Sequence, residues 1–317
     1  MLEELNFTIN EALVSNLDRL TREESIVGEQ RLLELSDIAA CLADVSARMR
    51  DDGLSVYDIL SYLSEGIGLG TYPISDLATP ENVDVIKRKL SAVARMDKVV
   101  LSDLYVRELS LRSPVAEKDF LPTTELGEDF TYVRNSLSDE AYDVFADSFS
   151  DPRVRYSASF RDCAAAVAEG SVSFCLLPLE ERGGVRLPTV SEIIFRNDFK
   201  INSVTPVFGP DGTADMKYAL VSRSFTVPER NVGDDRYLEI RIGAESDLSL
   251  AGLLSAVDYF GMSVYRLNTL TFETEGENEI YFSAVIRDGG NDFTPLLAYL
   301  TLFTEDFVPV GIYKNLE

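Results

Sequence analysis

The sequence contains no histidine. This absence excludes Ser-His-Asp and Cys-His catalysis, and it removes both the commonest general base near neutral pH and the usual imidazole ligand of zinc. Cysteine is scarce too: Cys41, Cys163 and Cys175 form no C-x-x-C pair, and each lies among apolar residues. We therefore expect free, buried thiols in a reducing compartment, with no metal site and no cofactor.

Basic residues are few. The chain has 29 Lys and Arg against 54 Asp and Glu, a formal net charge of −25, and acidic residues are in excess in 1–120, in 121–230 and in 231–317. Such a surface repels phosphate backbones and anionic lipid, so we expect no nucleic-acid partner and no membrane. The sequence has no apolar run of about 18 residues, and its first residues, MLEELNFTIN, lack the basic start of a signal peptide. We expect a cytoplasmic protein.

The 317 residues, 45% of them hydrophobic, suffice for two or three packed cores. Residues 1–112 read as a helical bundle, because apolar residues recur at three- and four-residue steps in 31–50, 56–65 and from 80 to about 109. Residues 113–128, with two prolines and little periodicity, read as a linker.

Strand and helix patterns alternate in residues 129–228, which favours an α/β lobe whose strands are mostly parallel. Residues 229–317 follow the order βαββαβ, which is the ferredoxin-like plan. The predicted fold class is therefore a multidomain α+β protein with a helical bundle, one α/β lobe and a ferredoxin-like C-terminal domain.

The C-terminal block resembles an ACT domain of the aromatic amino-acid pathway. Asp247–Val257 stands where that family has a Gly-Ala-Leu helix start, 262–269 (MSVYRLNT) corresponds to its second strand, and 308–313 (VPVGIY) corresponds to its closing Leu-Gly-Ser-Tyr. The middle block is similar to prephenate dehydratase, whose Ala-Val-x-x-Gly and Pro-Ile-Glu motifs match 160–180 (FRDCAAAVAEGSVSFCLLPLE). Prephenate dehydratases have two lobes of the periplasmic-binding-protein type, and here no chain remains to build the second.

The N-terminal block resembles a helical chorismate mutase, since 53–58 (GLSVYD) follows that family's Gly-Leu-Pro-Val-Tyr-Asp. A chorismate mutase holds a dicarboxylate against cations that stabilise the transition state. The resemblance places this role on Arg22 and Arg50, with Asp58 and Asp103 at the other family positions. Only two of the family's cations remain, so the implied mutase activity is weak or lost.

Prephenate dehydratase needs a proton donor at the leaving hydroxyl and cations for two carboxylates. The family's Thr-Arg-Phe corresponds to Met216-Lys217-Tyr218, which loses the hydroxyl and keeps the cation as Lys217. Its Glu-Asn-Ser corresponds to Glu180-Glu181-Arg182, which brings a second negative charge to a place where an anion should bind. Glu180 and Lys217 are thus the candidate dehydratase residues, with a structural role as the alternative for Glu180.

In the ACT-like block the resemblance implies an effector site. It places the site at Leu248, Ser249 and Leu250, which replace the Gly-Ala-Leu turn, and at Asn268 and Thr269, which replace Glu-Ser. The ligand would be an aromatic amino acid, or else chorismate or prephenate. The same block offers a surface for a homodimer.

Three hypotheses follow. The first is a prephenate dehydratase/chorismate mutase-like protein of phenylalanine biosynthesis that has lost catalysis and serves as a regulatory or scaffolding subunit. The second is an active chorismate mutase, or less readily a dehydratase, with an atypical site. The third is a small-molecule sensor built on the ACT-like domain. A second chain that supplies the missing lobe is an open alternative.

Overall fold

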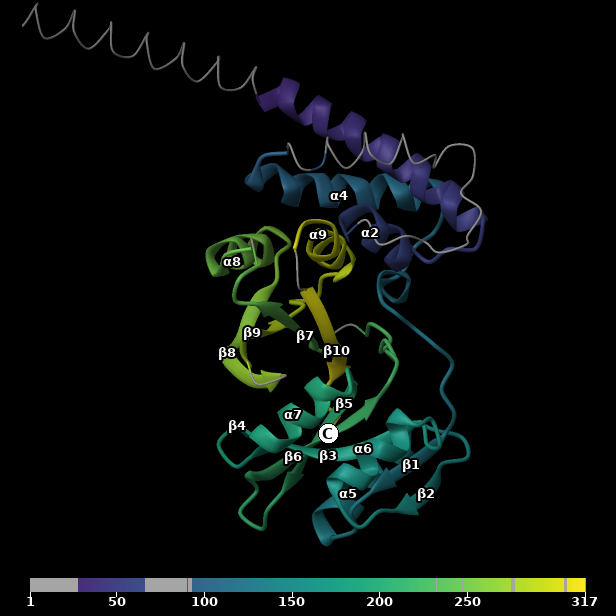
Figure 1. Ribbon diagram of the computed structural model, residues 1–317, viewed down its shortest axis with the longest axis vertical. Helices are drawn as coiled ribbons and strands as arrows, with labels where there is room; N and C mark the ends of the chain where they lie inside the picture. The colour runs from purple at the N-terminus through teal and green to yellow at the C-terminus, as the bar shows by residue number, and fades with distance from the viewer. Residues whose placement is uncertain are drawn as a thin grey trace, which may run out of the picture. The chain divides into compact units, whose positions relative to one another are not determined.

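The computed structural model describes residues 28–65, 90, 93–231, 233–246, 248–274, 277–304 and 307–316 (Figure 1). The chain divides into two compact units, which draw on Met1–Met49 with Ile74–Pro114 and on Arg50–Pro73 with Val115–Glu317. The four-part division at residues 112, 128 and 228 is a division by sequence pattern, and it stays a prediction.

The first unit contains a helix over residues 28–51, of which 28–49 belong to this unit, and α4 (Arg95–Arg112). The Tyr105 hydroxyl of α4 donates a hydrogen bond to Ser46 Oγ at 3.0 Å, in a buried contact. The helix predicted from residue 80 to about 109 is not continuous, because Ala94 has extended backbone and α4 begins only after it. Apolar spacing does not reveal a single extended residue of this kind. The predicted residues 80–89 and Arg22 lie outside the described part of the chain.

The α/β part of the second unit begins with two well-capped helices. Asn135 accepts hydrogen bonds from the backbone amides of Leu137 and Ser138, and Ser159 accepts one from Asp162, as its Ser-x-x-Asp pattern predicts. The elements in order are β1 (Asp129–Tyr132), α5 (Ser136–Ala146), β2 (Arg153–Tyr156), α6 (Phe160–Ala168), β3 (Phe174–Glu181), β4 (Val185–Arg186), α7 (Pro188–Arg196), β5 (Lys200–Phe208) and β6 (Ala214–Ser222).

Two of the five strand pairings in this part are parallel and three are antiparallel, which corrects the prediction of mostly parallel neighbours. Strands β2, β1 and β3 are parallel, whereas β6 runs antiparallel to both β3 and β5, and β4 antiparallel to β3. The reason is the short connection between β5 and β6, where Gly209 and Thr213 close a tight turn with a 2.8 Å hydrogen bond. Such a turn makes a hairpin, since parallel strands need a long crossover.

The last part of the chain has the predicted order βαββαβ. Its strands pair antiparallel in the order β10-β7-β9-β8, with β8 at the edge. The elements are β7 (Arg236–Gly243), α8 (Leu250–Tyr259), β8 (Ser263–Thr274), β9 (Glu277–Arg287), α9 (Thr294–Phe303) and β10 (Phe307–Lys314). Helices α8 and α9 cover the side of these strands that faces away from the α/β part (Figure 1).

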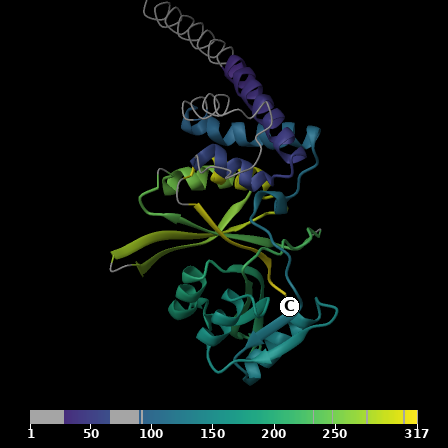
Figure 2. The same cartoon turned by 45° about the vertical axis from the view of Figure 1, so that its right-hand side comes forward.

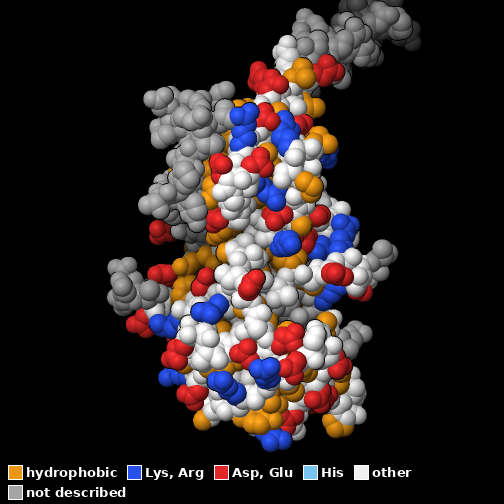
Figure 3. Space-filling model, turned by 90° about the vertical axis from the view of Figure 1, so that its right-hand side faces the viewer, with side chains coloured by type: hydrophobic (Ala, Val, Ile, Leu, Met, Phe, Trp, Pro, Cys, Tyr) orange, Lys and Arg blue, Asp and Glu red, His pale blue; other side chains and the backbone are white. Residues whose placement is uncertain are grey.

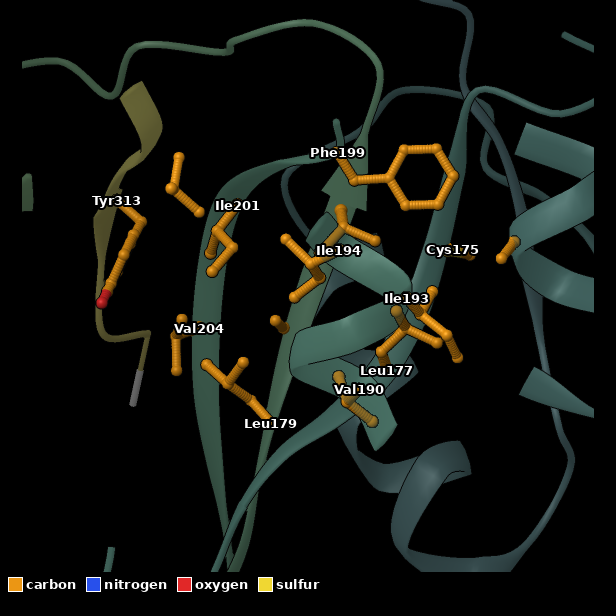
Figure 4. Packing of buried hydrophobic residues seen from close by; sticks show 14 of the residues in the cluster. Cys175, Leu177, Leu179, Val190, Ile193, Ile194, Phe199, Ile201, Val204 and Tyr313 are labelled. Atoms are coloured by element: carbon orange, nitrogen blue, oxygen red, sulfur yellow. The ribbon is translucent and has the colours of Figure 1, made fainter. Parts of the chain in front are cut away.

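One sheet runs through both parts of the second unit. Strand β10 pairs with β5 at Gly311 and Ile201, which continues the order β2-β1-β3-β6-β5-β10-β7-β9-β8. The approach there is close: a Cβ on residue 311 would lie 2.5 Å from the Ile201 carbonyl oxygen, so only glycine fits. The two parts also share a core, in which Tyr313 of β10 lies beside Ile201 and Val204 of β5 (Figure 4).

Residues 113–128, predicted as a linker, carry ordered and buried structure. They include the 3₁₀ helix η1 (Glu117–Phe120), and Phe120 and Leu121 are each 1% exposed. Both η1 and α2 (Val56–Glu65) contact α9 (Figure 2). The prolines and weak periodicity of this segment accompany irregular, partly buried backbone, and its role as a linker stays a prediction.

Acidic and basic side chains are interspersed on the face of the molecule in Figure 3, and the basic ones form no continuous patch there. Among the helices that the structure describes, none is both long enough and apolar enough to cross a bilayer.

Candidate functional site

Glu180 lies near the end of β3, between two basic strand neighbours. In the sheet register it is directly opposite Arg186 of β4 on one side and Lys217 of β6 on the other. A β-bulge between Pro178 and Glu180 offsets the β3–β6 ladder at this point. Glu180 is only 4% exposed, so its charge depends on protein partners.

Three cations surround the Glu180 carboxylate. Arg186 Nε donates to Oε1 at 3.2 Å, and Lys217 Nζ lies 3.7 Å from Oε2. Arg266, which comes from β8 in the βαββαβ part, binds both oxygens, with Nη2 at 3.1 Å from Oε2 and Nη1 on Oε1. This side chain therefore connects the two parts of the second unit through a bidentate ion pair.

A second carboxylate extends the same group of charges. Arg186 donates two hydrogen bonds to Glu239 of β7, at 3.0 and 2.5 Å, and the Tyr313 hydroxyl donates to Glu239 at 3.2 Å. Glu239 is 4% exposed. We call Glu180, Arg186, Lys217, Glu239 and Arg266 the junction cluster.

The cations determine the charge state of Glu180. Burial alone would raise the pKa of Glu180, but the hydrogen bond from Arg266 and the charges of Arg186, Arg266 and Lys217 outweigh burial and lower that pKa below its ordinary 4.5. Burial raises the pKa of the Tyr313 hydroxyl well above its ordinary value, so Tyr313 stays neutral and can donate to Glu239. Glu180 is therefore a carboxylate and not a proton donor at neutral pH.

The pKa shift predicts a pH dependence of stability. Because the pKa of Glu180 is lower in the folded than in the unfolded chain, its stabilising effect is complete above about pH 5.5 and is lost as pH falls through the folded pKa. We expect the difference in unfolding free energy between wild type and Glu180→Gln to be largest at pH 7 and to shrink toward pH 3.5. Urea unfolding at several pH values measures this difference. A difference that is constant or that grows on acidification would contradict the assignment.

The two candidate dehydratase residues, Glu180 and Lys217, lie side by side and pair with each other. Lys217 faces the buried Glu180, and the cavity that both line has a volume of about 10 Å³. This leaves room for little more than one water molecule, whereas small-molecule sites usually enclose several hundred Å³.

The candidate mutase residues lie at helix ends and on a helix surface. Arg50 is 3.7 Å from Asp119, and Asp58 accepts a 2.7 Å hydrogen bond from the Ser55 hydroxyl in the first turn of α2. Asp103 pairs with Arg107 one turn along α4, at 2.7 Å. Arg22 lies outside the described residues. The mutase site on these four residues stays a prediction.

The candidate effector residues do not line one described cavity. Leu248 is 8% exposed, Ser249 caps α8 by accepting from the Gly252 amide at 3.2 Å, and Leu250 is 37% exposed. Asn268 lines a cavity beneath β7, β8 and β9, while Thr269 is exposed on β8. Leu248, Ser249 and Leu250 are not among the residues that line this cavity.

Sequence reasoning missed Arg186, Glu239 and Arg266. Arg186 comes after Gly183, Gly184 and Val185, and a glycine pair of this kind indicates a turn and not the short strand β4 that follows it. In 237–242 (YLEIRI) two charged residues alternate with apolar ones on a strand, so both face the same side, but such alternation does not tell whether that side is buried.

No protein-family model matches the sequence, and no curated protein matches it. Among solved structures, the chain is similar to prephenate dehydratase from Streptococcus mutans, with 13% identity over 60% of this chain and 99% of that chain, at a TM-score of 0.43. It is similar to prephenate dehydratase from Arthrobacter aurescens in complex with L-Phe, with 14% identity over 58% of this chain and 89% of that chain, at 0.43.

The chain is also similar to GqqA, described as a novel type of quorum-quenching acylase, with 19% identity over 59% of this chain and 93% of that chain, at a TM-score of 0.42. TM-scores below 0.5 decide neither fold nor function. The fold and the site therefore rest on the geometry of this chain.

Proposed function

We propose that this chain is a prephenate dehydratase-like protein without dehydratase activity, which serves phenylalanine biosynthesis as a regulatory or scaffolding subunit. The observation that carries the proposal is the junction cluster. Lys217, the one cation that the dehydratase motif would retain, has the buried carboxylate of Glu180 at 3.7 Å. The protein's own carboxylate thus takes the place that a substrate carboxylate would need.

Two further features support the loss of catalysis. The adjacent cations Arg186 and Arg266 are also engaged by Glu180, so no cation of the cluster is left to receive a ring-bearing dicarboxylate. In the dehydratases that the chain resembles, the second lobe is inserted before the strand that corresponds to β6, whereas here a tight hairpin turn joins β5 directly to β6. An active mutase or dehydratase with an atypical site is the alternative, and a cytoplasmic location remains a prediction.

A sensor function is the second candidate, favoured by the βαββαβ part. Its β8 is twelve residues long and pairs only with β9 in the described sheet. An unpaired edge of this length can pair with the same edge of a second copy. A homodimer built in this way would place Thr269 and the start of α8 near the new interface, where an aromatic amino acid could bind as effector.

The proposal predicts that the purified protein converts neither chorismate nor prephenate. We expect chorismate absorbance to remain constant and no phenylpyruvate to appear, since the reacting groups and the space for substrate are both missing. The assay compares wild type with Arg50→Ala and Lys217→Met. Chorismate turnover that falls in Arg50→Ala, or phenylpyruvate formation that falls in Lys217→Met, would establish the enzyme alternative.

A further inference from the structure

A second cavity lies next to the junction cluster and is lined by polar side chains. It has a volume of about 20 Å³ and lies between α7 and the strands β7, β8 and β9. We call it the Arg241 cavity. Its polar lining residues are Arg186, Ser191, Glu239, Arg241, Asn268 and Ser283.

Arg241 is buried and has no direct ion-pair partner among the described residues, although the charges of Asp198 and Glu239 act on it. It is 5% exposed, its Nε has no hydrogen-bond partner, and no ion pair joins it to any described residue. Its guanidinium lies 4.8 Å from the centre of the Phe195 ring, which compensates part of the charge through a cation–π contact. Burial lowers the pKa of Arg241 from its ordinary value, which reports how poorly its charge is solvated.

The nearby carboxylates are already engaged by other groups. Both Glu239 oxygens accept from Arg186, and one also accepts from Tyr313. Asp198 binds Lys200 Nζ at 2.6 Å. Arg241 and the cations of the junction cluster therefore outnumber the buried carboxylates, and positive charge is in excess at this point of a strongly acidic protein.

Neutral donors complete the lining of the cavity. The side chains of Ser191, Asn268 and Ser283 make no hydrogen bond within the described chain; Ser283 is 5% exposed, and Ser191 and Asn268 are half-buried. Buried polar groups without protein partners are usually satisfied by water or by a ligand. A planar guanidinium with amide and hydroxyl donors beside it matches a carboxylate group, which accepts two parallel hydrogen bonds from arginine.

We infer that the Arg241 cavity binds one compact carboxylate, the size of formate, whose charge Arg241 balances. The volume limits the ligand, because about 20 Å³ holds little more than one water molecule. The inference is independent of the proposed loss of catalysis, because Arg241 belongs neither to the predicted dehydratase residues nor to the Glu180 contacts.

The test replaces chloride by formate at constant ionic strength and follows thermal unfolding. We expect the wild-type Tm to rise saturably, by about 2–5 °C at a formate concentration tenfold above its Kd. Arg241→Met should abolish the formate effect, and in chloride it should be at least as stable as wild type, because it removes an uncompensated buried charge. Line broadening of ¹³C-formate by wild type, absent with Arg241→Met, measures binding directly.

Two variants keep the test decisive. Asn268→Ala changes a half-buried residue of the edge strand, so this variant should fold and should show a weaker formate effect. It therefore still tests the inference if Arg241→Met does not fold. Arg196→Met changes an exposed arginine of α7, 55% exposed, and should leave the effect unchanged.

Two results would each overturn the inference: no formate effect in wild type, or an equal effect in Arg241→Met. Propionate should act more weakly than formate, and an equal effect of propionate or L-phenylalanine would overturn the size limit.

Discussion

Replacing Glu180 by glutamine is expected to lower the free energy of unfolding by about 3–5 kcal/mol at pH 7. Glutamine keeps the size of the side chain but removes the charge that Arg186, Lys217 and Arg266 share. Lys217 and Arg266 would then lose their counter-charge, while Arg186 would keep Glu239. The cost of burying an unpaired charge exceeds the attraction that it loses. Urea unfolding followed by circular dichroism measures the difference.

Glu181→Gln is the matched control, because Glu181 is the next residue on the same strand and its side chain is exposed. We expect this substitution to change the unfolding free energy by less than about 0.5 kcal/mol. If both variants behaved alike, Glu180 would have no special role at the junction, and the explanation for the loss of catalysis would fail.

Arg236→Met is expected to produce the second large loss, again about 3–5 kcal/mol. Arg236 is 2% exposed; it binds Asp288 through Nε at 3.0 Å and Glu117 through Nη1 and Nη2 at 2.5 and 2.8 Å. Burial raises the pKa of Glu117 despite these bonds, so the carboxylate already depends on the arginine. Methionine would leave Glu117 and Asp288 as buried carboxylates without a cation, and urea unfolding again measures the cost.

The position of Glu117 makes a more specific prediction for the same variant. Glu117 belongs to η1, and it also accepts a 2.9 Å hydrogen bond from the Phe293 amide just before α9. In Arg236→Met we expect proteases to cleave near residues 115–121 faster than in wild type. Arg287→Met, which changes an arginine that is 48% exposed, is the control. Unchanged stability and unchanged cleavage in Arg236→Met would show that residues 113–128 are the simple linker that the sequence suggests.

Local sequence signals predicted most elements of the second unit. The Ser159 cap, the succession of strand and helix patterns in 129–228 and the βαββαβ order of 229–317 depend on neighbouring residues only. Helix α2 occupies Val56–Glu65 as predicted. The alternating α/β pattern did not predict that β6 is antiparallel to its neighbours, because whether two strands are parallel depends on which strands pair. The short connection between β5 and β6 is the feature that would have predicted a hairpin.

The candidate site was less predictable, for a physical reason. Glu180 and Lys217 were singled out from the sequence, but their meaning depends on Arg266, which is 86 residues away from Glu180 along the chain. Whether a carboxylate is a catalytic group or a structural counterion depends on such distant cations and on burial. Neither is encoded in a local motif. Arg241 shows the same limit. Its place on a strand does not reveal that the nearby carboxylates of Glu239 and Asp198 bind Arg186 and Lys200 instead.

Chemical rescue of Glu180→Ala tests the central claim most directly, namely that the Glu180 carboxylate occupies an anion site made by Lys217, Arg186 and Arg266. The measurement is Tm as acetate replaces chloride at constant ionic strength, with wild type measured in the same salts so that any effect through Arg241 cancels. The account predicts that Glu180→Ala is strongly destabilised in chloride and that acetate recovers part of this loss saturably, beyond its effect on wild type. Equal acetate effects on both proteins, or a Glu180→Ala variant as stable as wild type in chloride, would contradict it.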